Sequence, residues 1–183
     1  MKRLLLLVVL AALVRYNACA QKVYIGCPEH VNTKPHAGFL DKQAVDLVIS
    51  DSRVIPADSK TECQGTDVKQ ALKNLLQSDF PSCTITLLTD TGKASNPKGI
   101  MIRLAITAYQ ATRAKSEWTG SVNYHVMIID DRNGKARKVS EDISNDTTRP
   151  YLFGYKSAKT CLFTSFDKSN QDLVAFIESS LKE

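Results

Sequence analysis

The sequence lacks most motifs that announce a particular chemistry. It has no G-x-S-x-G nucleophile elbow, no Walker phosphate loop and no G-x-G-x-x-G dinucleotide fingerprint. None of its cysteines forms a C-x-x-C pair, which argues against a thioredoxin-like redox site. Internal repeats and low-complexity tracts are also missing. We therefore name no catalytic residue, and we rank an enzyme of unrecognised mechanism behind the binding functions considered below.

Long apolar runs are scarce, and the single one lies close to the amino terminus. Lys2 and Arg3 precede the run Leu4 to Val14, which is followed by Ala18-Cys19-Ala20 and Gln21. This order is that of a secretory signal with a small-x-small cleavage site. The run has about eleven residues, whereas a membrane-spanning helix needs roughly 20. We predict that residues 1–20 are a signal peptide and that the mature protein is exported, to the periplasm or beyond the cell.

Cys19 leaves a second processing route open. Bacterial lipoproteins are cut immediately before a cysteine that then carries lipid, and Ala18 suits such a cut. Tyr16 is a poor substitute for the leucine that usually stands at its position. Lipidation at Cys19 is therefore the alternative to cleavage after Ala20, and it would attach the protein to a membrane surface.

Excess charge of one sign is also small in the mature chain. The precursor has 24 basic and 19 acidic residues, a net charge of +5. The predicted signal holds three of the basic residues, Lys2, Arg3 and Arg15, and no acid, so its removal leaves +2. We expect no nucleic-acid partner, because nothing in the bulk charge favours one.

Four cysteines remain after the predicted signal, an even number that favours disulfides in an exported chain. These disulfide candidates are Cys27, Cys63, Cys83 and Cys161. Three pairings are possible, and the sequence does not choose among them. Cys27, His30 and His36 have spacing suggestive of zinc, but a fourth ligand would have to come from the distant Cys63. Disulfides with exposed loop histidines are the better interpretation, and we expect no metal and no cofactor.

Residues 21–183 fit a single domain. Proline and glycine make 21–43 irregular. Alternating apolar residues predict strands at 44–54 and 82–88, and the stripe after Thr66 predicts a helix ending near Ser78. A further helix is expected after Ser169, which has capping-box spacing to Asp172. The segment 149–164 is ambiguous, although its aromatic cluster, Tyr151 to Tyr155, could cover one end of the core.

Two long strands give the clearest periodicity of the mature chain. The residues expected to face inward are Ile100, Ile102, Leu104, Ile106 and Ala108 in the first strand, and Val122, Tyr124, Val126 and Ile128 in the second. Asn133-Gly134 predicts a hairpin turn, and the charged segment 135–144 suits an edge strand. Together these patterns predict an α+β domain of two layers: an antiparallel sheet of three to five strands with two amphipathic helices packed on one face.

The layout resembles small bacterial envelope lipoproteins of the YajG type. The similarity covers about residues 44–182, and it rests on the paired strands Ile100–Ala111 and Trp118–Asp130, on Val48–Arg53 with its D-x-R ending, and on Lys168–Asp172 before an amphipathic helix. The resemblance implies an α+β fold, an envelope location and no known catalysis. This chain departs from that pattern in its weak lipobox and its four additional cysteines.

The function that we expect is that of an exported, non-catalytic binding or accessory protein of the envelope or extracellular space, acting through protein–protein interaction. Its surface would be the outward sheet face or the strand edge at 135–144. The candidate binding residues are Arg103, Tyr109, Trp118, Asn123 and His125. Trp118 opens the second long strand, where an aromatic side chain more often packs against the sheet end than anchors a partner. The alternative function is a carrier of a small apolar or amphiphilic ligand, bound between sheet and helices near Tyr151–Tyr155.

Overall fold

The computed structural model describes residues 22–28, 34–89 and 98–182. The predicted signal peptide, Cys19 and His30 lie outside these ranges. The described elements follow one another in the order β1 (Val23–Ile25), β2 (Ala44–Asp51), β3 (Lys60–Thr61), α2 (Gly65–Asp79), β4 (Thr84–Leu88), β5 (Ile100–Ala114), β6 (Glu117–Asp130), β7 (Arg137–Pro150), the 3-10 turn η1 (Tyr151–Phe153) and α3 (Tyr155–Leu181). None of the described helices is both long enough and apolar enough to cross a membrane.

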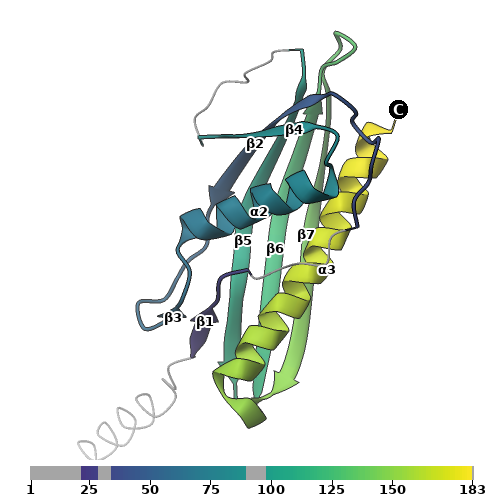
Figure 1. Cartoon of the computed structure of the whole chain (residues 1–183). Coiled ribbons are helices and arrows are strands. Elements are labelled where there is room, and N and C mark those ends of the chain that lie inside the picture. Colours follow the sequence, from purple (N-terminus) through teal and green to yellow (C-terminus); the bar gives the residue numbers. More distant parts are fainter. Residues whose placement is uncertain (1–21, 29–33, 90–97, 183) are drawn as a thin grey trace, which may run out of the picture.

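The strands form one curled, mixed sheet of seven strands with α2 and α3 on one face (Figure 1). The mixed α/β composition and the two helices on one face agree with the expectation, but the predicted sheet was too small and wrong in direction. β2 is parallel to both β4 and β5. The β2–β4 pair is parallel because α2 carries the chain back across the sheet between them. The remaining long pairs, β5–β6 and β6–β7, are antiparallel as predicted.

β5 is the central strand, and one of its edges is shared by two strands of opposite direction. β2 pairs with its first half, from Val45–Ile100 to Asp51–Ile106, and β1 pairs with its second half at Thr112 and Ala111. Where the two partners change over, the register of β5 against β6 shifts between Ile106 and Ala108. This irregularity is a β-bulge, which adds one residue to a strand and turns the residues after it to the other face.

The bulge corrects the placement of Tyr109. Strict alternation predicted an outward Tyr109, but its side chain is fully buried, its hydroxyl donates to the Gly26 carbonyl oxygen at 3.0 Å, and its ring packs edge-on against Phe166. The expected inward position of Ala108 is likewise lost, because Ala108 is only half-buried. The inward residues before the bulge and along β6 are buried as predicted.

The helix α3 spans almost the whole sheet and begins far earlier than predicted. Its buried face includes Leu162, Phe166, Leu173 and Ile177. Ser169 does not cap a helix: it is buried inside α3, and its hydroxyl donates to the Val122 carbonyl oxygen at 2.9 Å. Ser165 makes the same contact with the Gly120 carbonyl oxygen at 2.8 Å. These small polar residues join the helix to β6, and they hid the helical stripe from the sequence pattern.

Trp118 belongs to the core at the end of the sheet where α3 begins. Its side chain is fully buried, and its ring lies 5.6 Å from that of Tyr155 and 6.3 Å from that of Tyr151. Of the predicted cluster at 151–155, Tyr151 and Tyr155 therefore cover this end of the core, whereas Leu152 and Phe153 are exposed. The choice of Trp118 as a candidate binding residue is therefore wrong, because its side chain has no exposed surface with which to contact a partner.

Candidate functional site

The outer face of the sheet carries three of the candidate binding residues. The outward positions expected for Arg103 and His125 are confirmed, and Asn123 is half-buried in the same outward register. His125 Nδ1 lies 2.6 Å from Asp142 Oδ1, and the Ser144 hydroxyl donates to Asn123 Oδ1 at 2.9 Å. With 46% of its side chain exposed, His125 is a solvated ion-pair residue on an open surface. This face could meet a partner, but it does not enclose a ligand.

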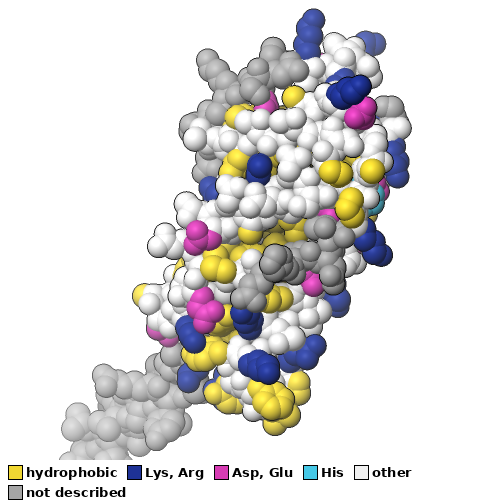
Figure 2. Space-filling model, in the orientation of Figure 1, with side chains coloured by type: hydrophobic (Ala, Val, Ile, Leu, Met, Phe, Trp, Pro, Cys, Tyr) yellow, Lys and Arg dark blue, Asp and Glu magenta, His cyan; other side chains and the backbone are white. Residues whose placement is uncertain are grey.

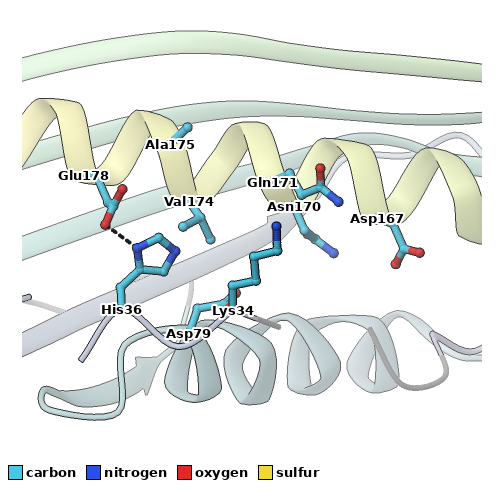
Figure 3. Close-up of a pocket in the computed structure, with 9 residues that line it drawn as sticks. All are labelled: Lys34, His36, Asp79, Asp167, Asn170, Gln171, Val174, Ala175 and Glu178. Atoms are coloured by element: carbon cyan, nitrogen blue, oxygen red, sulfur yellow. Dashed lines mark ion pairs between the residues drawn. The ribbon is translucent and has the colours of Figure 1, made fainter. Parts of the chain in front are cut away.

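A cavity of about 380 Å³ lies on the opposite side of the sheet, between the end of α2 and the second half of α3 (Figure 3). One irregular segment and two helices contribute to its lining, which consists of Lys34, His36, Asp79, Asp167, Asn170, Gln171, Val174, Ala175 and Glu178. The six α3 residues recur at helical intervals of three and four, so they share one face of the helix. Asp79 is the last residue of α2, and it approaches that face from the other side.

His36 closes one end of the cavity and is held from both helices. Its Nδ1 lies 2.5 Å from Glu178 Oε1 on α3, and its backbone N–H donates to the Asp79 carbonyl oxygen at 2.7 Å. The imidazole ring also packs 5.9 Å from that of Phe80. The spacing of His36 from Cys27 suggested a zinc ligand; in the structure the His36 imidazole instead packs against α3, beside the carboxylate of Glu178.

Two further carboxyl groups of the cavity are disfavoured as anions. Burial raises the pKa of Asp79, and the nearby His36 only partly opposes that effect. Burial alone raises the pKa of Asp167. A desolvated carboxylate without a strong cationic partner is a costly group that a bound cation would stabilise.

Asn170 supplies the most specific observation. Asn170 is 2% exposed, and neither its Nδ2 nor its Oδ1 has a hydrogen-bond partner among the described residues. Its side chain points from α3 towards α2, into the space that the carboxylates border (Figure 3). Buried amides in native proteins are almost always hydrogen-bonded, so an unpartnered one at a cavity indicates a ligand or water position.

The lining of the cavity is mainly polar and carries groups of both charges. The nine lining residues include three carboxylates, two amides, the basic residues Lys34 and His36, and the apolar side chains of Val174 and Ala175. Such a set can accept hydrogen bonds from an ammonium or guanidinium group and can contact its alkyl chain.

The sequence analysis missed this cavity. Its signal was the spacing of Asp167, Asn170, Gln171 and Glu178, but the helix was expected to start only at Ser169, so these polar residues were not placed on one face. The predicted interior cleft near Tyr151–Tyr155 is also not where the cavity lies. The described space between sheet and α2, lined by side chains such as Val45, Leu76 and Ile102, has no room for a water molecule.

The cysteines form a second cluster of chemically active groups. The sulfur atoms of Cys27 and Cys63 and a carboxylate oxygen of Asp67 all lie within 4.8 Å of one another. The pKa of the Cys63 thiol is raised by burial and by the neighbouring Cys27. All four described cysteines are free thiols in the structure, so the two expected disulfides are not present there.

Cys83 and Cys161 are too far apart to form a bridge. Cys83 lines the same small void as Ile177, whereas Cys161 packs against Gly120. Ile177 and Cys161 are separated along α3 by about 24 Å at 1.5 Å per residue, while a disulfide needs Cα atoms within roughly 7 Å. Each thiol instead donates to a carbonyl oxygen three residues earlier, that of Phe80 and that of Ala158.

Comparison with known proteins identifies a fold and no family. No protein-family model matches the chain. No curated protein matches it either. Among solved structures, an uncharacterised protein shares 10% identity over 86% of this chain and 98% of its own length, with a TM-score of 0.51. The hypothetical protein CT253 from Chlamydia trachomatis gives 14% identity, 75% and 96% coverage and a TM-score of 0.47. Lipoprotein GNA1162 from Neisseria meningitidis shares 11% identity over 73% of this chain and 99% of its own length, with a TM-score of 0.36.

At 10% identity, the similarity to the uncharacterised protein concerns the fold alone. The similarities to CT253 and GNA1162 are too distant to carry an argument. One of these neighbours is a bacterial lipoprotein, and nothing among them points to the YajG type in particular. Function has to be argued from the cavity and the surfaces.

Proposed function

We propose that the protein is exported to the cell envelope or the extracellular space and acts there by binding, taking a ligand with a primary amine or guanidinium group into the α2–α3 cavity. The observation that carries this proposal is Asn170, a buried amide without a described partner beside two carboxyl groups that burial disfavours as anions. A cationic nitrogen group would donate hydrogen bonds to the unpartnered Asn170 amide oxygen and to these carboxyl groups.

This proposal modifies the carrier function considered from the sequence. The ligand expected there was apolar or amphiphilic, but the cavity lining is mainly polar, with Val174 and Ala175 as a minor apolar component. An alkyl amine, or the side chain of a lysine or arginine in a peptide, matches both components. Lys34 is an exposed residue of the lining whose side chain extends towards Asn170 and Gln171 on α3 (Figure 3), so a ligand that also carries an anionic group could contact its ammonium.

The test is titration calorimetry of the protein chain from Gln21 onwards with a diamine, 1,4-diaminobutane, and with its neutral analogue 1,4-butanediol. We expect binding of the diamine and no heat from the diol. Asp167→Asn and Asn170→Leu should each weaken the diamine roughly tenfold or more, because each removes a hydrogen bond to a charged group. Asp58→Asn, which removes an exposed loop carboxylate, is the matched control and should change nothing. Equal binding of diamine and diol, or equal losses in the control, would contradict the proposal.

A second candidate function rests on the free edge of β7. This strand pairs with β6 along its whole length, from Asp130–Arg137 to Glu117–Pro150, and no strand of the described ranges pairs with its other edge. A protein partner could add a strand there, beside the outward face that carries Arg103, Asn123 and His125. A photo-cross-linker at Ser140 on β7 should then capture a partner that the same group at Asp58 does not, and identical products from both positions would argue against it.

A further inference from the structure

Three segments distant in sequence meet at the end of the molecule where α3 begins. The Arg113 N–H donates to the Lys22 carbonyl oxygen at 2.9 Å, which places the residue before β1 beside the end of β5. The Tyr151 N–H donates to the Ser116 carbonyl oxygen at 2.8 Å, which joins η1 to the β5–β6 turn. We call the surface formed by residues 22, 113–117 and 149–156 the basic tip.

The basic tip presents two large apolar side chains to solvent. Leu152 is 81% exposed and Phe153 is 73% exposed, although they follow the aromatic residues that cover the core. Their backbone is held in place, since Tyr151 packs on the buried Trp118 ring and the Arg113 guanidinium lies 3.5 Å from the Tyr151 ring centroid. Exposed apolar side chains on a well-ordered backbone are typical of surfaces that bind a protein, a membrane or a ligand.

Positive charge surrounds these apolar side chains. The charged residues of the basic tip are Lys22, Arg113, Lys115, Arg149 and Lys156, with Glu117 as the single acid among them. Figure 2 shows apolar side chains bordered by lysine and arginine at this end of the molecule. Arg149, Phe153 and Lys156 also line a shallow pocket of about 230 Å³ together with Ser157 and Thr160. An apolar centre with a basic rim is complementary to an anionic lipid surface, where acyl chains lie beneath phosphate groups.

The place where the chain enters the domain points to the same occupant. Lys22 lies in the basic tip, and Cys19 stands only three residues earlier in the sequence. If Cys19 carries lipid, three residues at about 3.5 Å each keep the basic tip within about 10 Å of the bilayer surface. A soluble form cleaved after Ala20 would present the same residues to a membrane by diffusion.

We propose that the basic tip docks on an anionic phospholipid surface, with Leu152 and Phe153 entering the headgroup region and Arg149 and Lys156 contacting lipid phosphates. The docking does not depend on the α2–α3 cavity, which lies further along α3. It would leave the cavity and the free edge of β7 accessible to ligands away from the membrane.

The test is co-sedimentation with vesicles, using the chain from Gln21 onwards, which includes every described strand and helix. We expect binding to vesicles of phosphatidylcholine mixed with phosphatidylglycerol, weakened by added salt, and little binding to phosphatidylcholine alone. The double variant Arg149→Gln, Lys156→Gln should bind roughly 30-fold more weakly, because each basic residue near such a surface contributes about fivefold. The matched control, Lys135→Gln with Lys138→Gln, removes two exposed lysines near the β6–β7 hairpin and should bind as the parent does.

A second readout reports insertion itself. In Phe153→Trp the new indole should shift its emission to shorter wavelength when phosphatidylglycerol vesicles are added, while the buried Trp118 supplies a constant background. Equal binding to both vesicle types, equal losses in the lysine control, or an unshifted indole would overturn the proposal. So would concentration-dependent self-association that Phe153→Ser abolishes, since the occupant of the basic tip would then be a second copy of this chain.

Discussion

Arg53 and Asp51, two residues apart at the end of β2, form a two-pronged ion pair with Nε and one terminal nitrogen 2.7 and 2.6 Å from the two carboxylate oxygens. The same arrangement recurs at the end of β6, where Arg132 contacts Asp130 at 2.8 and 2.6 Å. In both cases the arginine backbone N–H also donates to the carboxylate. Each arginine then reaches a distant carbonyl oxygen, that of Tyr109 and that of Leu181 respectively. The D-x-R ending noticed in the sequence is therefore a structural clamp.

Replacing Arg53 with methionine should destabilise the fold by about 3 kcal/mol. The Arg53 side chain is 2% exposed, so its loss leaves Asp51 without its partner in a largely buried position. Urea unfolding measures the change, and Lys135→Met, at an exposed position, is the control.

The same variant should alter the acid limb of the stability curve. The hydrogen bond from Arg53 lowers the pKa of Asp51 below its ordinary value of 3.8. A lowered carboxyl pKa stabilises the folded state above 3.8, and this contribution is lost as the pH falls through the lowered value. Arg53→Met should lose less stability than the parent over that window, and parallel pH curves would contradict the role given to the pair.

Asp167→Asn should stabilise the protein at neutral pH. Burial raises the pKa of Asp167 above 3.8, so the folded state binds a proton more tightly than the unfolded state does. The contribution of Asp167 to the free energy of unfolding therefore falls as the pH rises from 3.8 through the raised pKa. The asparagine variant has no group that titrates there, so its stability does not fall for this reason. We expect a gain below about 1 kcal/mol, because the group keeps solvent contact. Melting at pH values on both sides of that window, with Asp58→Asn alongside, measures it; a loss of stability in Asp167→Asn at neutral pH would contradict the assignment.

Gly120→Ala should destabilise the fold by about 3 kcal/mol, the upper range for overpacking. A methyl group at Gly120 would lie 2.4 Å from the Cys161 carbonyl carbon and 2.6 Å from its oxygen, so α3 would have to move off β6. Ser121→Ala, at the neighbouring outward position, is the control for strand propensity. Calorimetric melting of both variants tests the prediction, and equal melting temperatures would show that the helix approaches less closely than described.

Oxidation should join Cys27 to Cys63 and leave the other two thiols free. The two sulfur atoms are within 4.8 Å of one another, and a dithiol oxidase of the exported compartment would take the two electrons and two protons that the bond releases. Alkylation of the unfolded protein without reductant should then label Cys83 and Cys161 alone. Labelling at all four cysteines would contradict the bridge, and labelling at none would contradict the separation of Cys83 from Cys161.

Periodicity located most of the strands, but their pairing depends on contacts that a local pattern does not encode. The strand from Ile100, the strand ending near Asp130 and the Asn133-Gly134 turn all occur, with φ of +71° at Gly134. The direction of β2 against β4 follows from the path of α2, which no alternation pattern records. Tyr109 was misplaced because one bulged residue reverses every side chain after it.

The candidate site was harder to predict for a related reason. The first half of α3 mixes serine, threonine and lysine with its apolar residues, so that segment lacked an evident stripe. Ser165 and Ser169 satisfy their hydroxyls on carbonyl oxygens of β6, a role that only the assembled sheet makes possible. Without the early start of α3, Asp167 and Asn170 could not be placed on one helical face opposite Asp79.

The divided edge of β5 also determines when the chain can finish folding. Val23 lies opposite Thr112, so the first described strand meets β5 only after about ninety further residues have been synthesised, and contacts of such long range form slowly. Its other neighbour, β3, pairs with it only through Lys60 and Thr61. The β5–β6–β7 meander, by contrast, consists of sequence neighbours and can form by itself. A newly made chain therefore completes the pairing of its first described strand only after β5 has been synthesised.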